Sequence, residues 1–241
     1  MQSYFIWKGI DCRSMGVRTS GPAPIVRPEE RVQHIQIPGR SGDLTQIEGE
    51  DIYNSYIQTV TIQVDGWSNV RNVYSWLRGD GYVTFSGEPD RQQKARIIGA
   101  VTLNKKSRNL DIWVGEVQFY CQPLKELLIE DYLTISTSGA VIRNCGDMIA
   151  KPWMRVLASG TSFTVTISGD GIPTNTLTVA DIEASKHYRI FSDSMEVWDN
   201  AHDTLLTYKS TGEFPLLGVG KNTITFTGIS SIQFHKQERF L

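Results

Sequence analysis

Hydrophobic and polar residues alternate along short stretches of this chain, with Gly, Asp, Asn and Pro between them. A period of two places every second side chain on one face of a β-strand, as a half-buried sheet requires. The clearest case is 56–64, Tyr-Ile-Gln-Thr-Val-Thr-Ile-Gln-Val. Further strands are predicted in the first half of the chain at 32–37, 81–85, 96–103 and 110–119.

The same alternation returns in the second half, after a weakly patterned stretch around 123–144. The polar cluster Ser-Thr-Ser-Gly at 136–139 is typical of a connection between domains, so we place a boundary near residue 137. Eight short strands without a helix favour a β-sandwich. They are predicted at 153–157, 162–168, 176–179, 187–191, 195–198, 204–208, 223–226 and 231–234.

One amphipathic helix interrupts the first half. Its expected N-cap is Ser68, and Gly79 is expected to end it in a left-handed conformation. The apolar stripe has the i, i+3, i+4, i+7 spacing and consists of Val70, Val73, Tyr74 and Leu77. Trp76 lies beside the stripe, where core packing is favoured over an exposed aromatic anchor.

Composition and charge limit the number of domains and the classes of function to be considered. The chain has 241 residues, which favours two domains, and its 24 Lys and Arg residues nearly balance 26 Asp and Glu residues. A protein that holds nucleic acid through phosphates needs a clustered basic surface, and the nearest candidate, 105–108, is better explained as a solvated hairpin tip. Neither half is therefore expected to bind nucleic acid.

Cysteine and histidine usage argues against a metal site or a disulfide framework. The three cysteines are far apart and form no Cys-x-x-Cys pair, and the four histidines are scattered. The first residues lack a signal-peptide pattern, and no run approaches the roughly 18 apolar residues of a membrane span. We therefore expect a chain made in a cytosol, with no cofactor, no metal and no membrane partner.

A search for catalytic motifs yields no catalytic residue. Gly39-Arg40-Ser41-Gly42-Asp43 resembles a serine-hydrolase elbow only until its fifth position, which is Asp, and it does not lead into a predicted helix. Ser41 is therefore not assigned as a nucleophile. The sequence does not exclude a glycosidase with two catalytic carboxylates, because two acids that lie close in space need not be neighbours in the chain.

Several short segments, in order along nearly the whole chain, resemble the distal tail protein (Dit) family of long-tailed bacteriophages. The matching segments are Phe5–Asp11 with Gly16, Ile37–Leu44, Trp76-Leu77 with Gly79 and Gly81, Phe85–Asp90, Val117–Pro123, Asn144–Gly146, Pro152 and Gly212–Asn222. Each segment alone is a weak signal, and their order and spacing across both halves carry the resemblance.

This resemblance implies a mostly β fold: a split-barrel-like N-terminal domain with one helix, followed by a galectin-like β-sandwich. With the boundary above, the domains are 1–137, which forms a ring, and 138–241. The resemblance further implies a virion protein at the tail tip, synthesised in the host bacterial cytoplasm. Its implied partners are itself as a homo-hexamer, the tail tube protein and the tail-associated fibre or lysin protein, with DNA only in passage through the ring.

Within this frame, the loop from Pro38 to Glu50 is expected to reach a neighbouring subunit. Arg40, Ser41 and Gly42 are the candidate interface residues, with the Arg40 guanidinium offered to an acidic partner. An ordinary surface turn, in which the glycines serve backbone geometry alone, is an equally weighted alternative.

Three acids after this loop, Glu48, Glu50 and Asp51, are candidates for a lumen surface. Like-charged walls prevent DNA from sticking in a channel, although a solvated loop tip explains the same residues.

Two rival functions remain. One is a carbohydrate-binding module that aids host-surface adhesion, with Trp198 as the candidate stacking residue among six tryptophans that mostly suit a core. The other is an enzyme, ranked last.

Overall fold

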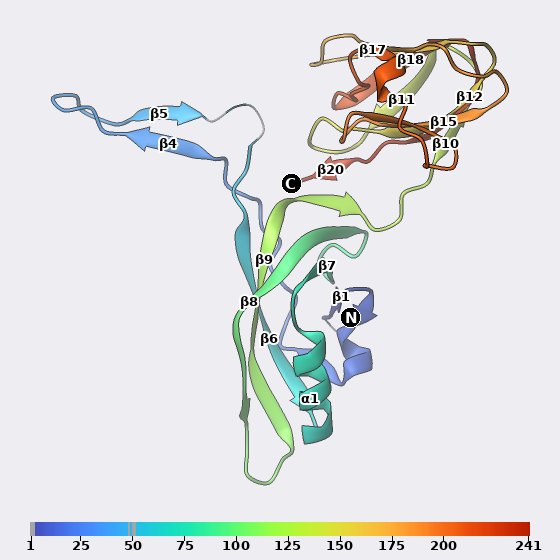
Figure 1. Ribbon diagram of the computed structural model, residues 1–241. Helices are drawn as coiled ribbons and strands as arrows, with labels where there is room; N and C mark the ends of the chain where they lie inside the picture. The colour runs from blue at the N-terminus through green and yellow to red at the C-terminus, as the bar shows by residue number, and fades with distance from the viewer. Residues whose placement is uncertain (1–2, 48, 50–51) are drawn as a thin grey trace. The chain divides into compact units, whose positions relative to one another are not determined.

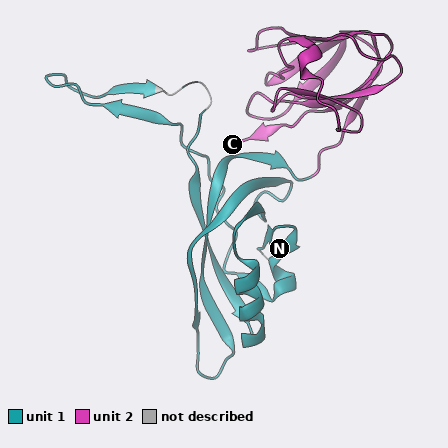
Figure 2. Ribbon diagram, viewed as in Figure 1, with its two compact units in different colours: residues 1–128, 241 teal, residues 129–240 magenta. Residues whose placement is uncertain are grey.

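The computed structural model describes residues 3–47, 49 and 52–241. Contacts divide the chain into two compact units (Figures 1 and 2). Unit 1 contains 1–128 together with Leu241, and unit 2 contains 129–240. Both units consist mainly of β-strands, and the predicted mostly β fold is confirmed.

Unit 1 is built on one curled antiparallel sheet and a small separate hairpin. The sheet runs in the order β2–β1–β7–β8–β9–β6–β3, and the hairpin consists of β4 and β5. The strands are β1 (Phe5–Trp7), β2 (Ile10–Asp11), β3 (Val17–Thr19), β4 (Val32–Ile35), β5 (Leu44–Ile47), β6 (Tyr56–Asp65), β7 (Asp80–Phe85), β8 (Arg91–Lys105) and β9 (Ile112–Leu127). The helices are the 3₁₀-helix η1 (Cys12–Met15) and the α-helix α1 (Trp67–Trp76).

The sheet curls because its longest pair, β8 and β9, contains a bulge. The register shifts between Ile98 and Thr102, and Gly99 within the bulge has φ +69°. A bulge bends its strand and increases the local twist. Across from it, a Cβ on Gly115 would lie 1.9 Å from the Thr102 carbonyl oxygen, so the close pairing of the two strands requires glycine there.

Helix α1 covers the sheet through Val70, Val73 and Trp76, which are buried. The core placement of Trp76 is confirmed, whereas Tyr74 is 42% exposed and does not belong to the buried stripe. Ser68 is not the N-cap, because the helix begins at Trp67 and Gly66 occupies the N-cap position. Instead, the Asp111 carboxylate, just before β9, accepts a hydrogen bond of 2.7 Å from the Trp67 backbone N–H. A side chain remote in sequence thus satisfies a helix-terminal donor.

An aromatic cluster joins the first strand to this helix. The indole N–H of Trp7 donates to the Trp76 carbonyl oxygen and that of Trp76 donates to the Trp7 carbonyl oxygen, both at 3.2 Å. Phe5 stacks on Trp76 with ring centroids 5.6 Å apart, and Phe119 from β9 packs edge-on against Phe5 and Trp7. These buried indoles have partners for their polar atoms, as buried tryptophans require.

Unit 2 is a two-sheet sandwich, as the sequence predicts. One sheet has the order β10–β19–β12–β15–β16 and the other β11–β18–β13–β14–β17. The sandwich strands are β10 (Leu133–Ile135), β11 (Ala140–Asn144), β12 (Trp153–Ala158), β13 (Phe163–Gly169), β14 (Asn175–Val179), β15 (His187–Phe191), β16 (Glu196–Asp199), β17 (Ser210–Gly212), β18 (Gly220–Thr227) and β19 (Ile229–His235). The short strand β20 (Arg239–Phe240) follows and belongs to neither of these two sheets. The strand expected at 204–208 does not form, and the 3₁₀-helix η2 (Thr207–Lys209) takes part of its place.

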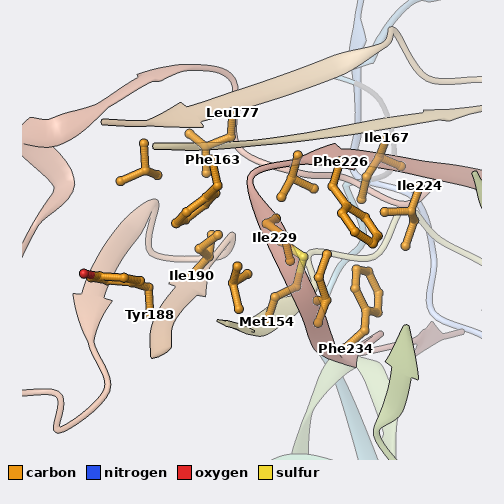
Figure 3. Close-up of a cluster of buried hydrophobic side chains, with 14 of the residues drawn as sticks. Met154, Phe163, Ile167, Leu177, Tyr188, Ile190, Ile224, Phe226, Ile229 and Phe234 are labelled. Carbon is orange, nitrogen blue, oxygen red and sulfur yellow. The ribbon is translucent and has the colours of Figure 1, made fainter. Parts of the chain in front are cut away.

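Alternate side chains of both sheets fill the space between them (Figure 3). In β12, Met154, Val156 and Ala158 point into this core, while the residues between them are only partly covered. Phe163 and Leu177 from one sheet meet Ile190 and Phe234 from the other within the same cluster. Burying apolar surface on one face of each sheet supplies the main stabilisation of this unit.

Candidate assembly surfaces

The hairpin of β4 and β5, called the arm below, contains the segment in which the sequence predicts an interface. Its register pairs Val32 with Ile47 and Ile35 with Leu44. The connecting turn places Gly39 and Gly42 at φ +82°, and the Arg40 N–H donates to the Ile37 carbonyl oxygen at 3.2 Å. Positive φ is readily adopted by glycine alone among ordinary residues, so these two glycines shape the tip of the arm.

The arm has no buried face of its own among its described side chains. Ile35, Ile37 and Leu44 are each about two-fifths exposed, at 40%, 39% and 42%. The two strands pair only with each other and form a sheet separate from the curled sheet (Figure 1). A lone two-stranded hairpin is marginally stable in water. Its apolar side chains therefore suit a surface that a partner covers.

The base of the arm is held in a defined geometry. Glu30 pairs with Tyr53 as a β-bridge, and the backbone N–H of Arg31 donates to the Ile52 carbonyl oxygen at 2.8 Å. The Asn54 N–H donates to the Glu29 carbonyl oxygen at the same distance. Backbone hydrogen bonds therefore also join the two chain segments at the base of the arm.

The candidate interface residues Arg40, Ser41 and Gly42 all lie exposed at the tip of the arm. Within the described residues, Arg40 forms no ion pair, so its guanidinium is available to a carboxylate outside the chain. No hydrogen bond connects Ser41 to a histidine in that part of the chain. The candidate lumen acids Glu48, Glu50 and Asp51 lie outside the described residues.

Sequence reasoning missed β5 and its role as the partner of β4. The signal was present, because isoleucines at 35 and 37 precede the Pro-Gly turn and Leu44 and Ile47 follow it at nearly symmetric positions. Hydrophobic residues mirrored around a glycine-containing turn are typical of a β-hairpin.

The two edge strands of the curled sheet, β2 and β3, are a second candidate assembly surface. The edge strands β2 and β3 have only two and three residues. Short edge strands limit unwanted pairing between sheets, while the amides they leave unpaired can still take an added strand.

Side chains suited to nucleophilic or metal chemistry are few among the described residues. Burial raises the pKa of Cys12 and raises that of Cys121 to about 12, so both thiols stay protonated at neutral pH and make poor nucleophiles. Across the described residues, no three His, Cys, Asp or Glu side chains gather where they could hold a metal ion. In the same part of the chain, no helix has the length and apolar character needed to cross a membrane.

Comparison with known proteins finds solved structures with a similar fold. No protein-family model matches the chain, and no curated protein does. Among solved structures, the Dit protein of phage SPP1 matches with a TM-score of 0.79 and 18% identity over 100% of both chains. That protein is described as a paradigm of the hub adsorption apparatus in phages that infect Gram-positive bacteria. A chain of the activated phage p2 baseplate matches with a TM-score of 0.50 and 11% identity, over 98% of this chain and 97% of that one.

The predicted stacking residue Trp198 lies on the outer face of unit 2 and is already engaged. Its indole N–H donates to the Glu196 carboxylate at 3.0 Å, and His202 packs edge-on against its ring at a centroid distance of 4.3 Å. Trp198 is therefore tied to its own unit through its indole N–H and through one ring contact.

Proposed function

We propose that this chain is a distal tail hub protein of a long-tailed bacteriophage, of the Dit type, and that about six copies close into a ring. The observation that carries the proposal is the likeness to the SPP1 Dit fold over the full length of both chains. A match that includes both the curled sheet with its arm and the sandwich supports a common role more strongly than a match of one sandwich alone.

In this proposal, 1–137 is the ring-forming domain and 138–241 the sandwich domain on its outside, although the sandwich also includes strand β10 (Leu133–Ile135), just before this boundary. A ring forms when one patch of a subunit binds a different patch of the next and the rotation closes. The arm suits the first patch, because Ile35 and Leu44 are exposed and Arg40 is unpaired within the described residues. Contact with a neighbouring copy removes that apolar surface from water.

The ring stands at the tail tip of the virion after synthesis in the host cytoplasm. It binds the tail tube protein on one side and the tail-associated fibre or lysin protein on the other, and DNA passes through its opening. Co-expression with each partner, followed by purification through a tag on the partner, tests both contacts. Failure to recover the chain with either one contradicts the hub role.

The ring is tested by measuring the mass of the full chain in solution and imaging it by negative-stain microscopy. We expect a particle of about six copies with a central opening. The double variant Ile35→Ser with Leu44→Ser and the single variant Arg40→Glu are expected to shift the mass towards the monomer. Val141→Ser is the matched control, because Val141 is a 63% exposed apolar residue of unit 2. A monomeric wild type, or arm variants that keep the ring intact, contradict the proposed role of the arm.

We further propose that Glu48, Glu50 and Asp51 line the opening and repel DNA. Replacing all three with Gln or Asn is expected to make assembled rings retain DNA at low salt, because like charge no longer keeps the phosphates away. Rings that release DNA equally well with and without these acids refute their lumen role.

A further inference from the structure

The outer face of one sandwich sheet carries two neighbouring arginines whose charge is not balanced by the described residues. Arg155 in β12 and Arg189 in β15 are directly opposite in the strand register. Like charges at opposing positions destabilise a strand pair. Within the part of the chain that the structure describes, neither guanidinium has a carboxylate partner. The Nε atom of Arg189 is sealed from solvent and has no hydrogen-bond partner.

The register shows what surrounds this pair on the same face. Gln233 lies opposite Arg155 on the β19 side, and Trp198 lies opposite Arg189 on the β16 side. The adjacent row across the sheet has three aromatic residues in register, His235, Trp153 and Phe191, and continues to Glu196 on β16, whose carboxylate accepts the Trp198 indole N–H. The three rings stack on one another, at 3.9 Å between His235 and Trp153 and 5.8 Å between Trp153 and Phe191. These stacked rings form an aromatic strip beside the arginine pair.

A groove begins next to the arginine pair. It has a volume of about 530 Å³, within the roughly 300–1,000 Å³ of small-molecule sites. Asn200 and His187 both line it. Asn200 joins the groove to the pair, because its Oδ1 accepts a hydrogen bond of 2.9 Å from Arg155 Nε. Burial, and secondly the positive charge of Arg155, lower the pKa of His187, so its ring is neutral at pH 7 and offers one donor and one acceptor.

Other polar groups in the groove are also uncommitted. The Asp181 carboxylate and the Ser185 hydroxyl line it, and neither has a hydrogen-bond or ionic partner among the described side chains. Both residues have a left-handed backbone, with φ +53° and +61°. Non-glycine residues in this region cluster at functional sites, where surrounding structure holds them in place. The groove thus combines acceptors and donors in the mixture that sugar hydroxyls need.

We propose that this face of unit 2 binds an anionic carbohydrate, a sugar that carries a carboxylate or a phosphate. The Arg155–Arg189 pair holds the anionic group, and the groove with His187, Asn200 and Asp181 binds the sugar hydroxyls. Guanidinium groups suit both anions through paired hydrogen bonds. An acidic protein segment fits less well, because the carboxylates of Asp181, Glu183 and Asp199 also line the groove. This site is independent of the ring proposed above.

The test uses the full chain and four probes at constant ionic strength: glucose, glucuronate, glucose 6-phosphate and inorganic phosphate. Ligand-observed NMR and calorimetry are expected to show glucuronate or glucose 6-phosphate binding roughly tenfold or more tightly than glucose, as expected for charge-assisted hydrogen bonds. A preference between the two charged sugars identifies the anionic group. Inorganic phosphate is expected to compete weakly, because it leaves the groove empty.

Matched variants separate the two parts of the site. The double variant Arg155→Gln with Arg189→Gln is expected to remove the preference for charged sugars without lowering the melting temperature, because it relieves like-charge repulsion. His187→Ala is expected to weaken the charged sugars while leaving phosphate unchanged. Arg143→Gln is the control, since Arg143 is an exposed arginine in β11 of the other sheet.

Three outcomes overturn the proposal. They are the absence of sugar binding at millimolar concentration, equal binding of phosphate and sugar phosphate, and tight binding of a hexaglutamate peptide with no sugar binding. The last result would assign the face to an acidic protein segment. Because none of these measurements depends on ring formation, failure here leaves the hub proposal to its own test.

Discussion

The arm and the sandwich both consist of antiparallel strands, yet apolar side chains are buried in the sandwich and exposed in the arm. In β12 every second residue is buried against the facing sheet. In the arm, Ile35 and Leu44 pair across two strands and remain about 40% exposed. Alternation in the sandwich thus serves its own core, whereas the apolar residues Ile35 and Leu44 of the arm stay exposed.

This difference allows the proposed assembly to be tested separately from folding. The sandwich derives its stability from its own buried contacts, so substitutions there are expected to change the free energy of unfolding. The arm adds little buried surface, so substitutions there are expected to act mainly on association. The predictions below test this separation.

The largest effect is expected from Phe234→Ala in the sandwich core. Phe234 is fully buried in the cluster between the two sheets (Figure 3). Replacing a buried Phe with Ala typically costs about 3–5 kcal/mol, through lost burial and the cavity that remains. Urea unfolding of the full chain, monitored with a spectroscopic probe in unit 2, measures this decrease in the free energy of unfolding. A decrease below about 1 kcal/mol would mean that the core repacks around the site.

A smaller decrease in the free energy of unfolding is expected from Asn144→Ala, at the end of β11. The Asn144 amide donates to the carbonyl oxygens of Met148 and Leu217, and its Oδ1 accepts from the Gly146 N–H at 2.9 Å. Removing a buried hydrogen-bond partner lowers the free energy of unfolding by about 1–3 kcal/mol, because the backbone groups left behind are buried and cannot bond to water instead. Asn109→Ala, in the exposed β8–β9 turn, is the control. Equal unfolding midpoints for the two variants would contradict this role.

The Asn144 network explains part of the resemblance that the sequence carries. Asn144 and Asn222 belong to segments that resemble the Dit family, and the structure uses both to bind backbone atoms in tight turns. Asn222 Oδ1 accepts from the Gly218 N–H at 2.9 Å. Those motif positions therefore maintain the sandwich, and they say little about partners.

Period-two patterns located most strands of the curled sheet and sandwich, because one buried face imposes strict alternation. Short strands such as β1 and β2 contain too few residues to display a period. The helix cap was missed for another reason, since Asp111 lies far from Trp67 in sequence. At the candidate sites, sequence alone suggested Arg40 and Trp198. It could not reveal the Arg155–Arg189 pair, which exists only through the pairing of β12 with β15.

A modest, pH-dependent effect is expected from Asp193→Asn in unit 2. Asp193 lies 3.3 Å from Lys151 and 3.1 Å from Arg239. Burial raises its pKa, but the two cations outweigh burial and hold the pKa below its ordinary value of 3.8. A lowered carboxyl pKa stabilises the fold above the unfolded pKa, and this contribution disappears as the pH falls through the folded value.

The carboxylate of Asp193 is more than half exposed, so solvent screens the pair. We expect Asp193→Asn to lower the unfolding free energy at pH 7 by about 0.2–1 kcal/mol. The difference from wild type should shrink as the pH falls below the unfolded pKa and vanish once the pH is below the lowered folded pKa as well. Unfolding curves at several pH values check this, and a difference that persists at low pH would show that the amide disturbs packing instead.

The smallest effect on unfolding is expected from the arm variant Ile35→Ser with Leu44→Ser. Exposed substitutions away from caps and cores usually change stability by about 0.5 kcal/mol or less, so unit 1 should unfold as in wild type when both proteins are diluted to monomers. At concentrations where wild type assembles, the variant should unfold earlier, because it no longer gains stability from association. A dilution series of melting temperatures separates these contributions. If the variant is destabilised equally at every concentration, the arm contributes to folding of its own unit, and the contrast with the sandwich fails.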